Sequence, residues 1–376
     1  MKKASLIFLL GILLYGCSSS AYENAADYFN GKIKEVNDKS CQTKNVAWKE
    51  LILNGPNYGE VYVHDSIMVF YNSKLGDKFF NVFHVDTGEE LGRFCEKGNG
   101  LNEVIACSPM YSFFQEEGEL RTLLWAPHNN KLWDWNITQS LKQQKTIVKD
   151  IPYPWRKENN GVFYENMYAL TVDSLLVKNP AKGIYYDGDE TTLPFYQKRT
   201  ISTNQQIKKY DIYKQIIKNE DAYILDEFFF NSSDAIKPDG SKLVMAMRNL
   251  PQINIINLKT GEVCGYRLKG GDGFSVFKGD GNMKIHYQRV HADDHYIYAS
   301  YLGKNRDSDP RSGEPSTQTI HVFDWEGNMR YKLMIEGEDG AGKFFVDTVR
   351  NRLYSVHDNK DEVSYLDFKT ILDKKR

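Results

Sequence analysis

The sequence predicts an all-β fold, a six-bladed β-propeller of four-stranded antiparallel blades in which an N-terminal strand closes the last blade. Three observations lead to this prediction: an aromatic-rich composition, a recurrent hairpin phrase, and the spacing of that phrase. The 376 residues include 24 Tyr, 20 Phe and 6 Trp, which are residue types that favour strands over helices. Lys plus Arg (48) nearly balance Asp plus Glu (50), so no basic excess supports nucleic acid as a partner.

The hairpin phrase is clearest at 320–335, IHVFDWEGNMRYKLMI, where two runs of alternating apolar residues flank a turn. Gly and Asn in the turn adopt positive φ at low cost, as tight hairpins require. Variants of the phrase stand at 81–94, 131–144, 253–268 and 363–375. A further alternating run precedes most copies, at 66–72, 120–126, 242–248, 296–302 and 352–358. Each repeat therefore contains at least three strands, and often a fourth before them.

The residue before each turn marks the phase of the repeat. The markers are Asp86, Asp134, Asp187, Asn257, Asp324 and Asp367. Three intervals between successive markers span 43 to 53 residues, and the other two, of 67 and 70, indicate loop insertions. A repeat of about 40 to 50 residues with four strands is typical of a propeller blade. Six markers predict six blades, which bury their apolar faces against one another around an axis.

Two regions outside the repeat complete the predicted architecture. The stretch VAWKELIL at 46–53 is a lone strand, whereas the last repeat contains only about three. We predict that this strand completes the last blade, because the ring then has no unpaired edge at its seam. The insertion at 186–213 is polar, with a short helix as one interpretation of 207–217, and 303–318 is predicted to be an exposed loop.

The N-terminus has the pattern of an export signal. Lys2 and Lys3 precede an apolar run at 6–14, and LYGC follows at 14–17. The alternative is a transmembrane anchor, but a run of roughly ten apolar residues falls short of the ~20 needed to span a bilayer. We predict a signal peptide over 1–16, a lipidated N-terminus and tether over 17–43, and the propeller over 44–376.

The residues that end at Cys17 resemble a bacterial lipobox. That resemblance implies cleavage before Cys17 and acylation of its thiol and new amine, so the membrane is a partner through the N-terminal lipid. Ser18 follows the cysteine, where Asp would suggest inner-membrane retention in the enterobacterial sorting code. The predicted location is therefore the outer membrane, facing either the periplasm or the cell surface.

Four further cysteines, Cys41, Cys95, Cys107 and Cys264, are too few and too scattered for a disulfide-built scaffold. None forms a CxxC pair, which argues against a redox or metal site. Isolated, partly buried thiols are the favoured interpretation. A bridge between Cys95 and Cys107 is the one pairing to test, because these cysteines flank one loop.

The phrase GRFCEKGNGLNEV at 92–104 looks like the G-x-x-G-x-G-x-x-E phrase of a family of Bacteroidetes envelope proteins. The phrases at 320–333 and 344–358 add to this likeness. From about residue 51 to 374, the chain resembles the TolB-like six-bladed propeller lipoproteins of that phylum. One departure is Leu101-Asn102, where the family commonly has proline-glycine. The resemblance implies the fold and the envelope address, but it supplies no reaction and no catalytic residue.

Catalytic and metal-binding motifs are scarce in the sequence. No GxSxG nucleophile turn and no HExxH zinc motif is present. His286, His291 and His295 cluster beside two aspartates, but alternation places the first two on opposite faces of a strand. The acidic, Gly-rich stretches 187–190, 270–282 and 307–313 miss the register of a calcium loop, so ordinary turns explain them better. We therefore assign no catalytic residue, no metal ligand and no cofactor.

Aromatic residues give the best clue to a binding site. Seven aromatic and His residues gather within about 40 positions: Trp125, His128, Trp133, Trp135, Tyr153, Trp155 and Tyr164. Trp133 and Trp135 share one strand face and are expected to pack between blades. The loop 152–161 carries Trp155 and Arg156 at its tip, where a ring beside polar groups suits sugars or peptides. We predict Trp155 and Arg156 as ligand-binding residues.

Together these observations favour an envelope lipoprotein that acts as a non-catalytic ligand-binding or protein-interaction scaffold. A glycan, a peptide and a protein are the candidate partners. The alternative is a metal-dependent lactonase-like or lyase-like hydrolase that uses a site at the propeller axis. At least three carboxylate, Asn or His groups within metal-bonding reach at the axis would favour the enzyme.

Overall fold

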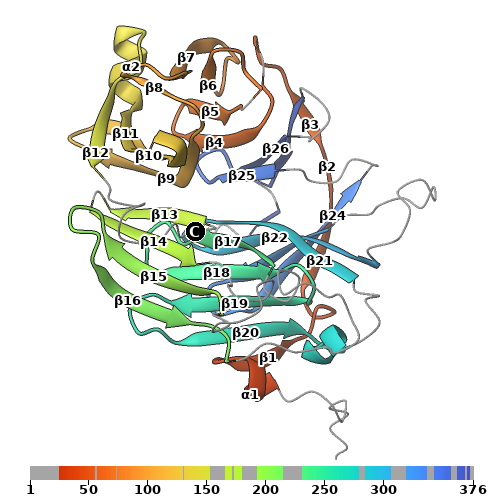
Figure 1. The fold of residues 1–376 in the computed structure, drawn as a ribbon. Coiled ribbons are helices and arrows are strands. Elements are labelled where there is room, and N and C mark those ends of the chain that lie inside the picture. Colours follow the sequence, from red (N-terminus) through yellow and green to blue (C-terminus); the bar gives the residue numbers. More distant parts are fainter. Residues whose placement is uncertain are drawn as a thin grey trace, which may run out of the picture.

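A computed structural model describes residues 25–55, 57–72, 74–129, 131–152, 166–171, 173–179, 193–214, 231–278, 284–305, 319–336, 343–356, 362–368 and 371–372. In these residues six small antiparallel sheets, the blades, stand in a ring (Figure 1). The predicted six-bladed propeller is therefore confirmed. No helix of the described segments is both long enough and apolar enough to cross a membrane.

The blades follow one another in chain order. Blade 1 comprises β4 (Glu60–His64), β5 (Ile67–Tyr71), β6 (Lys78–His84), β7 (Glu90–Lys97) and the short parallel β8 (Glu103–Val104). Blade 2 comprises β9 (Ser108–Glu116), β10 (Glu119–Ala126), β11 (Lys131–Asn136) and β12 (Val148–Pro152). Blade 3 comprises β13 (Asn166–Thr171), β14 (Ser174–Asn179), β15 (Phe195–Thr200) and β16 (Gln206–Asp211).

The second half of the ring repeats this arrangement. Blade 4 comprises β17 (Ser232–Ile236), β18 (Lys242–Met247), β19 (Gln252–Asn257) and β20 (Val263–Leu268). Blade 5 comprises β21 (Lys284–Ala292), β22 (Tyr296–Asn305), β23 (Thr319–Asp324) and β24 (Met329–Glu336). Blade 6 comprises β25 (Lys343–Asp347), β26 (Arg352–Val356) and β27 (Val363–Asp367), with β3 (Lys49–Leu51) as its outermost strand.

Within the described residues the hydrophobic core forms six clusters, one between each pair of neighbouring blades. Successive residues of one strand face different clusters: Leu123 of β10 packs toward blade 3, and Leu124 packs toward blade 1. Both side chains are at most 1% exposed. Because side chains alternate along a strand, each blade buries both faces only if it has a neighbour on each side. The ring supplies those neighbours, and β25 of blade 6 contacts β4 of blade 1.

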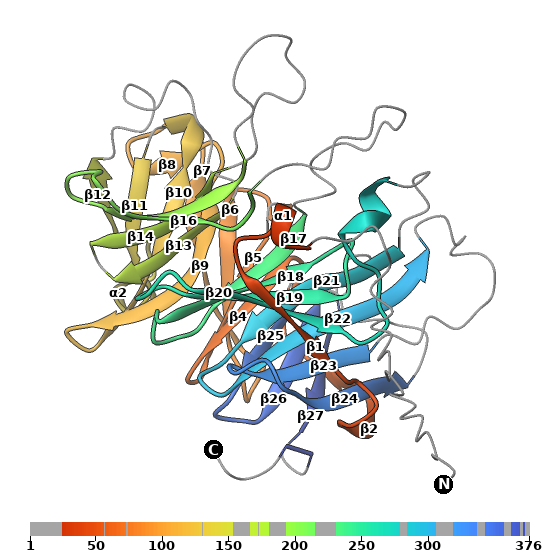
Figure 2. The ribbon, with the colours of Figure 1, turned by 90° about the horizontal axis from the view of Figure 1, so that it is seen from below.

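The N-terminal segment wraps around the outside of the ring (Figure 2). After α1 (Ala25–Tyr28), strand β1 (Lys32–Val36) pairs in parallel with β20 of blade 4, and β2 (Gln42–Ala47) pairs in parallel with β24 of blade 5. Strand β3 then pairs antiparallel with β27. The chain thus adds an outer strand to three blades in turn before blade 1 begins, and the predicted closure by a strand within 46–53 is confirmed.

The predicted boundary between tether and propeller at residue 43 is too late. Within 17–43, β1 and the start of β2 already belong to sheets, and the Phe29 side chain is buried between blades 3 and 4. The sequence signal is thin, because β1 and β2 each bury a single side chain, Val36 and Val46. These strands have no apolar face, and backbone hydrogen bonds to the open edges of β20 and β24 hold them instead.

Two other local predictions are wrong. The copy at 131–144 is not a hairpin, because β11 leads into helix α2 (Ile137–Gln143), where the Asn136 side chain accepts a hydrogen bond from the Gln139 amide N (2.9 Å). Asp134 therefore lies within a strand, not before a turn. The short helix considered for 207–217 is not formed as far as residue 211, because those residues belong to strand β16. Residues 215–217 lie outside the described residues, as does the marker Asp187.

Candidate functional site at the propeller axis

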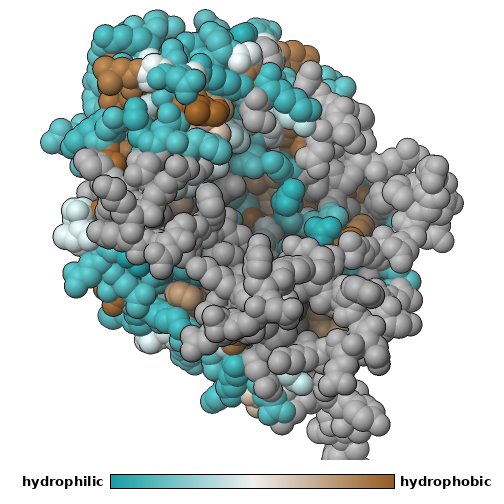
Figure 3. Space-filling model, viewed as in Figure 1, coloured by the Kyte–Doolittle hydropathy of each residue, from teal (hydrophilic) through white to brown (hydrophobic). Residues whose placement is uncertain are grey.

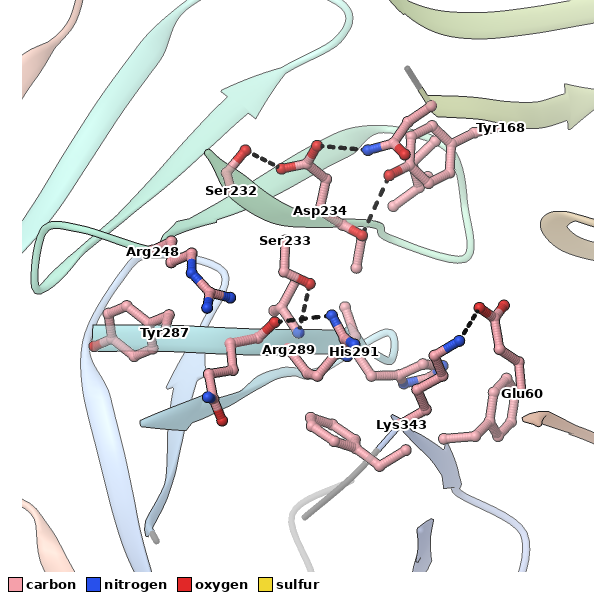
Figure 4. A pocket seen from close by; sticks show the side chains of 18 of the residues that line it. Glu60, Tyr168, Ser232, Ser233, Asp234, Arg248, Tyr287, Arg289, His291 and Lys343 are labelled. Carbon is pink, nitrogen blue, oxygen red and sulfur yellow. Dashed lines mark hydrogen bonds and ion pairs between the residues drawn. The ribbon is translucent and has the colours of Figure 1, made fainter. Parts of the chain in front are cut away.

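A cavity of about 400 Å³ lies at the centre of the ring. Its walls come from the innermost strands β4, β13, β17, β21 and β25, so five blades contribute (Figure 4). Strand β17, sequence SSDAI, has five partly exposed residues and no apolar alternation. An inner strand of this kind needs no second apolar face, because it borders the cavity. The propeller thus gathers side chains that are far apart in the sequence.

Asp234 forms the most buried polar cluster of the cavity wall. Its carboxylate accepts hydrogen bonds from Ser232 Oγ (2.6 Å), Asn166 Nδ2 (3.0 Å) and the Tyr196 hydroxyl. Lys178 Nζ lies 3.4 Å from Asp234 Oδ2, and both side chains are at most 1% exposed. A buried charge needs this number of partners to offset its lost hydration. Asp234 therefore ties blade 4 to blade 3.

Glu60 and Lys343 form the opposite side of the cavity (Figure 4). Lys343 Nζ donates to Glu60 Oε1 at 2.7 Å, and the Tyr62 hydroxyl donates to Glu60 Oε2 at 2.7 Å. The pair joins β25 of blade 6 to β4 of blade 1, at the seam of the ring. Both oxygens of this carboxylate are thus engaged by the protein.

Arg248 lies on the side of the cavity that faces away from Glu60, and Arg289 lies between them, beside His291 (Figure 4). The backbone of Arg248 is fixed between blades: its N–H donates to Asn231 O (2.9 Å), and its carbonyl accepts from the His286 N–H (2.7 Å). The Arg289 side chain is exposed, and its Nη1 donates to Gln288 O over 3.4 Å. The pairing of β21 with β22 has two register shifts before Arg289, and such irregularities change the direction of the side chains of a strand.

His291 also borders the cavity, with its ring centre 4.3 Å from that of Phe345. Its Nδ1 is buried and has no hydrogen-bond partner. Burial lowers the pKa of His291 to about 4, so the ring is neutral at pH 7 and presents no positive charge. Among the described lining residues, the cationic groups are therefore Arg248, Arg289 and Lys343.

The histidine cluster noted in the sequence does not converge. His286 lies in a second cavity, of about 240 Å³, where its Nε2 is 3.3 Å from Asp272 Oδ2 and its Nδ1 is 3.3 Å from the Tyr301 hydroxyl. His291 borders the axial cavity, and His295 is exposed beside Tyr296. Among the described residues, no three His, Cys, Asp or Glu side chains gather closely enough to hold a metal ion.

Other residues singled out in the sequence have varied outcomes. Trp133 and Trp135 are buried between blades 1 and 2, as expected. Cys95 and Cys107 belong to the same cluster as free thiols, so the bridge considered between them is not formed. The predicted ligand residues Trp155 and Arg156, and the lipidation site Cys17, lie outside the described residues.

The glycine phrase has a structural role. The carboxylate of Glu103 accepts a hydrogen bond from the Gly100 N–H (2.9 Å) and closes the turn between β7 and β8. Gly98 in this turn has φ of +155°, and a Cβ there would meet the Glu103 carboxylate at 2.0 Å. Glycine at 98 is thus required for the turn between β7 and β8, the last two strands of blade 1.

Comparison with known proteins identifies the family. The profile of the TolB-like 6-blade propeller-like family matches residues 34–348, which is more than half of the chain. The chain belongs to this TolB-like propeller family. Among curated proteins, no sequence is significantly similar to it.

Solved structures with the same fold include proteins of Bacteroides. A DUF4221 family member from Bacteroides vulgatus has a TM-score of 0.50 at 12% identity, over 86% of this chain and 96% of its own. A Bacteroides fragilis protein described as exported has a TM-score of 0.47 at 12% identity, over 89% and 97%. The calcium-binding protein regucalcin of Agrobacterium tumefaciens has a TM-score of 0.45 at 11% identity, over 87% and 95%. At these identities the likeness is one of fold.

The residues of the axial cavity were not recognised in the sequence. Asp234 lies in β17, Arg289 lies in β21, and Arg248 follows β18. No sequence motif joins these three residues. A usable signal was the interruption of apolar alternation in the first strand of a repeat, as at 232–236. That interruption marks strands whose side chains face the axis.

Proposed function

We propose that this TolB-like propeller is an envelope lipoprotein and a non-catalytic scaffold that binds a small ligand in the axial cavity. Its lipid anchor and outer-membrane address are supported by the resemblance of the residues before Cys17 to a lipobox. The resemblance to Bacteroidetes envelope proteins agrees with this address.

One observation carries the proposal of binding without catalysis: both carboxylates in the described lining of the cavity, Glu60 and Asp234, are already engaged. Glu60 accepts hydrogen bonds from Lys343 and Tyr62, and Asp234 accepts hydrogen bonds from Ser232, Asn166 and Tyr196. A general base or metal ligand needs a lone pair that is available to the reacting group. These carboxylates hold the blades together, whereas the volume of about 400 Å³ lies in the range of small-ligand sites.

The outer surface favours the cavity over a broad protein-docking face. On the face shown in Figure 3, the described residues are mainly hydrophilic, and hydrophobic residues form small separate groups. The large apolar side chains that are exposed in the described segments, Ile52, Leu101, Ile105, Ile207 and Val349, are spread over several blades and connecting loops. A protein-binding patch is usually a contiguous apolar surface. The concave, polar site is thus the better candidate for recognition.

A fragment screen tests this function. Ligand-observed NMR would follow a library of neutral and charged small molecules with the wild-type protein and with Ser233→Trp, which fills the cavity beside β21. We expect fragments that bind the wild type and lose binding in this variant. The control is Ser202→Trp, in an exposed turn of blade 3, which should bind like the wild type.

Two results would contradict the proposal. If every bound fragment also binds Ser233→Trp with the same affinity, the axial cavity is not the binding site. If the wild type hydrolyses a lactone and Ser233→Trp does not, while Ser202→Trp does, the enzymatic alternative is correct. Melting temperatures of the two variants report whether both are folded.

A further inference from the structure

We infer that the ligand of the axial cavity is a small organic carboxylate, with its anionic group on Arg289 and a flat apolar body against Phe344 and Phe345. This inference rests on the proposed ligand-binding function. It adds the chemical class and the orientation of the ligand.

The charges of the cavity support an anionic ligand. Among the described residues of its lining, two are acidic, Glu60 and Asp234, and three are basic, Arg248, Arg289 and Lys343. Each carboxylate has a lysine partner: Lys343 at 2.7 Å from Glu60, and Lys178, behind the wall, at 3.4 Å from Asp234. The acidic charge of the described lining is thus compensated before Arg289 is counted. In a confined cavity such an excess attracts anions more strongly than it would in open water.

The hydrogen-bonding capacity of Arg289 points in the same direction. A guanidinium has five N–H donors in a planar fork that matches a carboxylate. In the described structure, Arg289 uses one of them, in a hydrogen bond of 3.4 Å to Gln288 O. The remaining N–H groups are available to a ligand that brings oxygen acceptors. Lysine would offer a point charge but no such fork.

The aromatic side of the cavity defines the other end of the ligand. Phe344 and Phe345 line it from β25, and Tyr62 packs edge-on against Phe345 with ring centres 6.2 Å apart. Lys343 of the same strand is paired with Glu60, so among the described residues this side offers no uncompensated cation to a second negative charge. Aromatic walls favour a flat ring or other apolar body. A monocarboxylate with such a body therefore fits better than a dicarboxylate or inorganic phosphate.

Isothermal titration with matched probes tests the inference. The probes are benzoate and phenylacetate, each beside its neutral amide, together with glucuronate, which lacks a flat apolar body, and inorganic phosphate. We expect at least one carboxylate to bind about tenfold or more tightly than its amide, because a charge-assisted hydrogen bond is lost in the amide. Phosphate is expected to bind more weakly than that carboxylate, since it lacks the apolar body.

Variants of Arg289 locate the effect. Arg289→Gln should weaken the binding of the carboxylate by about tenfold or more and leave the binding of the amide unchanged. The affinity of Arg289→Lys for the carboxylate should lie between those of the wild type and Arg289→Gln. The matched control is Arg93→Gln on the outer strand β7, whose partner is Glu90, and it should bind like the wild type. Unchanged amide binding in Arg289→Gln would show that the cavity is intact.

The outcomes separate the inference from the function on which it rests. If the amides bind as tightly as the carboxylates and Ser233→Trp abolishes this binding, the ligand is not selected for its negative charge, but the cavity is still the binding site. If phosphate binds as tightly as every carboxylate, the inference that the ligand has an apolar body is wrong. If neither the probes nor the fragment library binds the cavity, both the inference and the proposed function are wrong.

Discussion

Lys178 and Asp234 form an ion pair between neighbouring blades, with 3.4 Å between Nζ and Oδ2 and both side chains at most 1% exposed. Removing one partner of a buried pair leaves the other charge without compensation, at a cost of about 3 to 5 kcal/mol. Lys178→Met should therefore lower the free energy of unfolding by about 3 kcal/mol, measured by urea denaturation.

The matched control for this pair is in the same blade. Lys209 lies 2.7 Å from Asp211, and both side chains are about half exposed. Exposed pairs contribute little because water already solvates both charges, so Lys209→Met should cost less than about 1 kcal/mol. Equal effects of the two substitutions would show that the Lys178 pair is not buried between blades.

The ring arrangement makes a prediction for two adjacent residues. Leu123 and Leu124 face different clusters, each between two blades. Truncation to Ala should destabilise the protein by about 2 to 5 kcal/mol at either position, measured by urea denaturation. Ile52→Ala, at a position that is 76% exposed, should cost less than about 0.5 kcal/mol. A surface-like effect at Leu123 or Leu124 would mean that blade 2 lacks one of its two neighbours.

Acid stability depends on His321, which is 1% exposed and stacks on Tyr301 with ring centres 4.4 Å apart. Burial lowers the pKa of His321 to about 3, whereas an unfolded His titrates near 6.5. The unfolded chain therefore binds the extra proton first, and the free energy of unfolding falls as the pH drops from about 6.5 toward 3.

Replacement of His321 tests this linkage. In His321→Phe, the dependence of the free energy of unfolding on pH should be less steep by about 1.4 kcal/mol per pH unit between pH 6 and 4. His295→Phe, at an exposed position, serves as the control and should keep the wild-type slope. The idea fails if His321→Phe and the wild type have the same slope over this interval.

The fold was accessible from the sequence because propeller blades repeat. Hairpins such as 320–335 and 253–268 recur with turns at Asp324 and Asn257, and in the structure these turns join the third and fourth strands of their blades. The strand at 46–53 was found because the last repeat lacks a strand. Strands β1 and β2 were missed, since each adds to a sheet through its backbone and buries one side chain.

The candidate site was much less accessible. Five inner strands from separate repeats meet at the axis, and only the closed ring brings Glu60 next to Lys343 across 283 positions of sequence. Polar residues on inner strands look like interruptions of an apolar pattern until the axis is known. The helix α2 was missed for a similar reason, because its buried side chains, Ile137 and Ser140, form no continuous apolar stripe.

The proposed lipid anchor predicts a change of location. Cys17→Ser removes the acylated thiol, so the protein should leave the membrane fraction and appear in the soluble fraction of the cell, followed by immunoblotting. Cys264→Ser, at a free thiol of blade 4, is the matched control and should stay with the membrane. Membrane retention of Cys17→Ser would contradict the anchor.

The most direct test of the account is a crystal structure of the protein with the carboxylate that binds best in the titrations. We expect the carboxylate oxygens within hydrogen-bond distance, roughly 2.7 to 3.2 Å, of the Arg289 guanidinium, and the body of the molecule against Phe344 and Phe345. A bound carboxylate anywhere outside the axial cavity, or one with its anionic group turned toward Glu60, would contradict it.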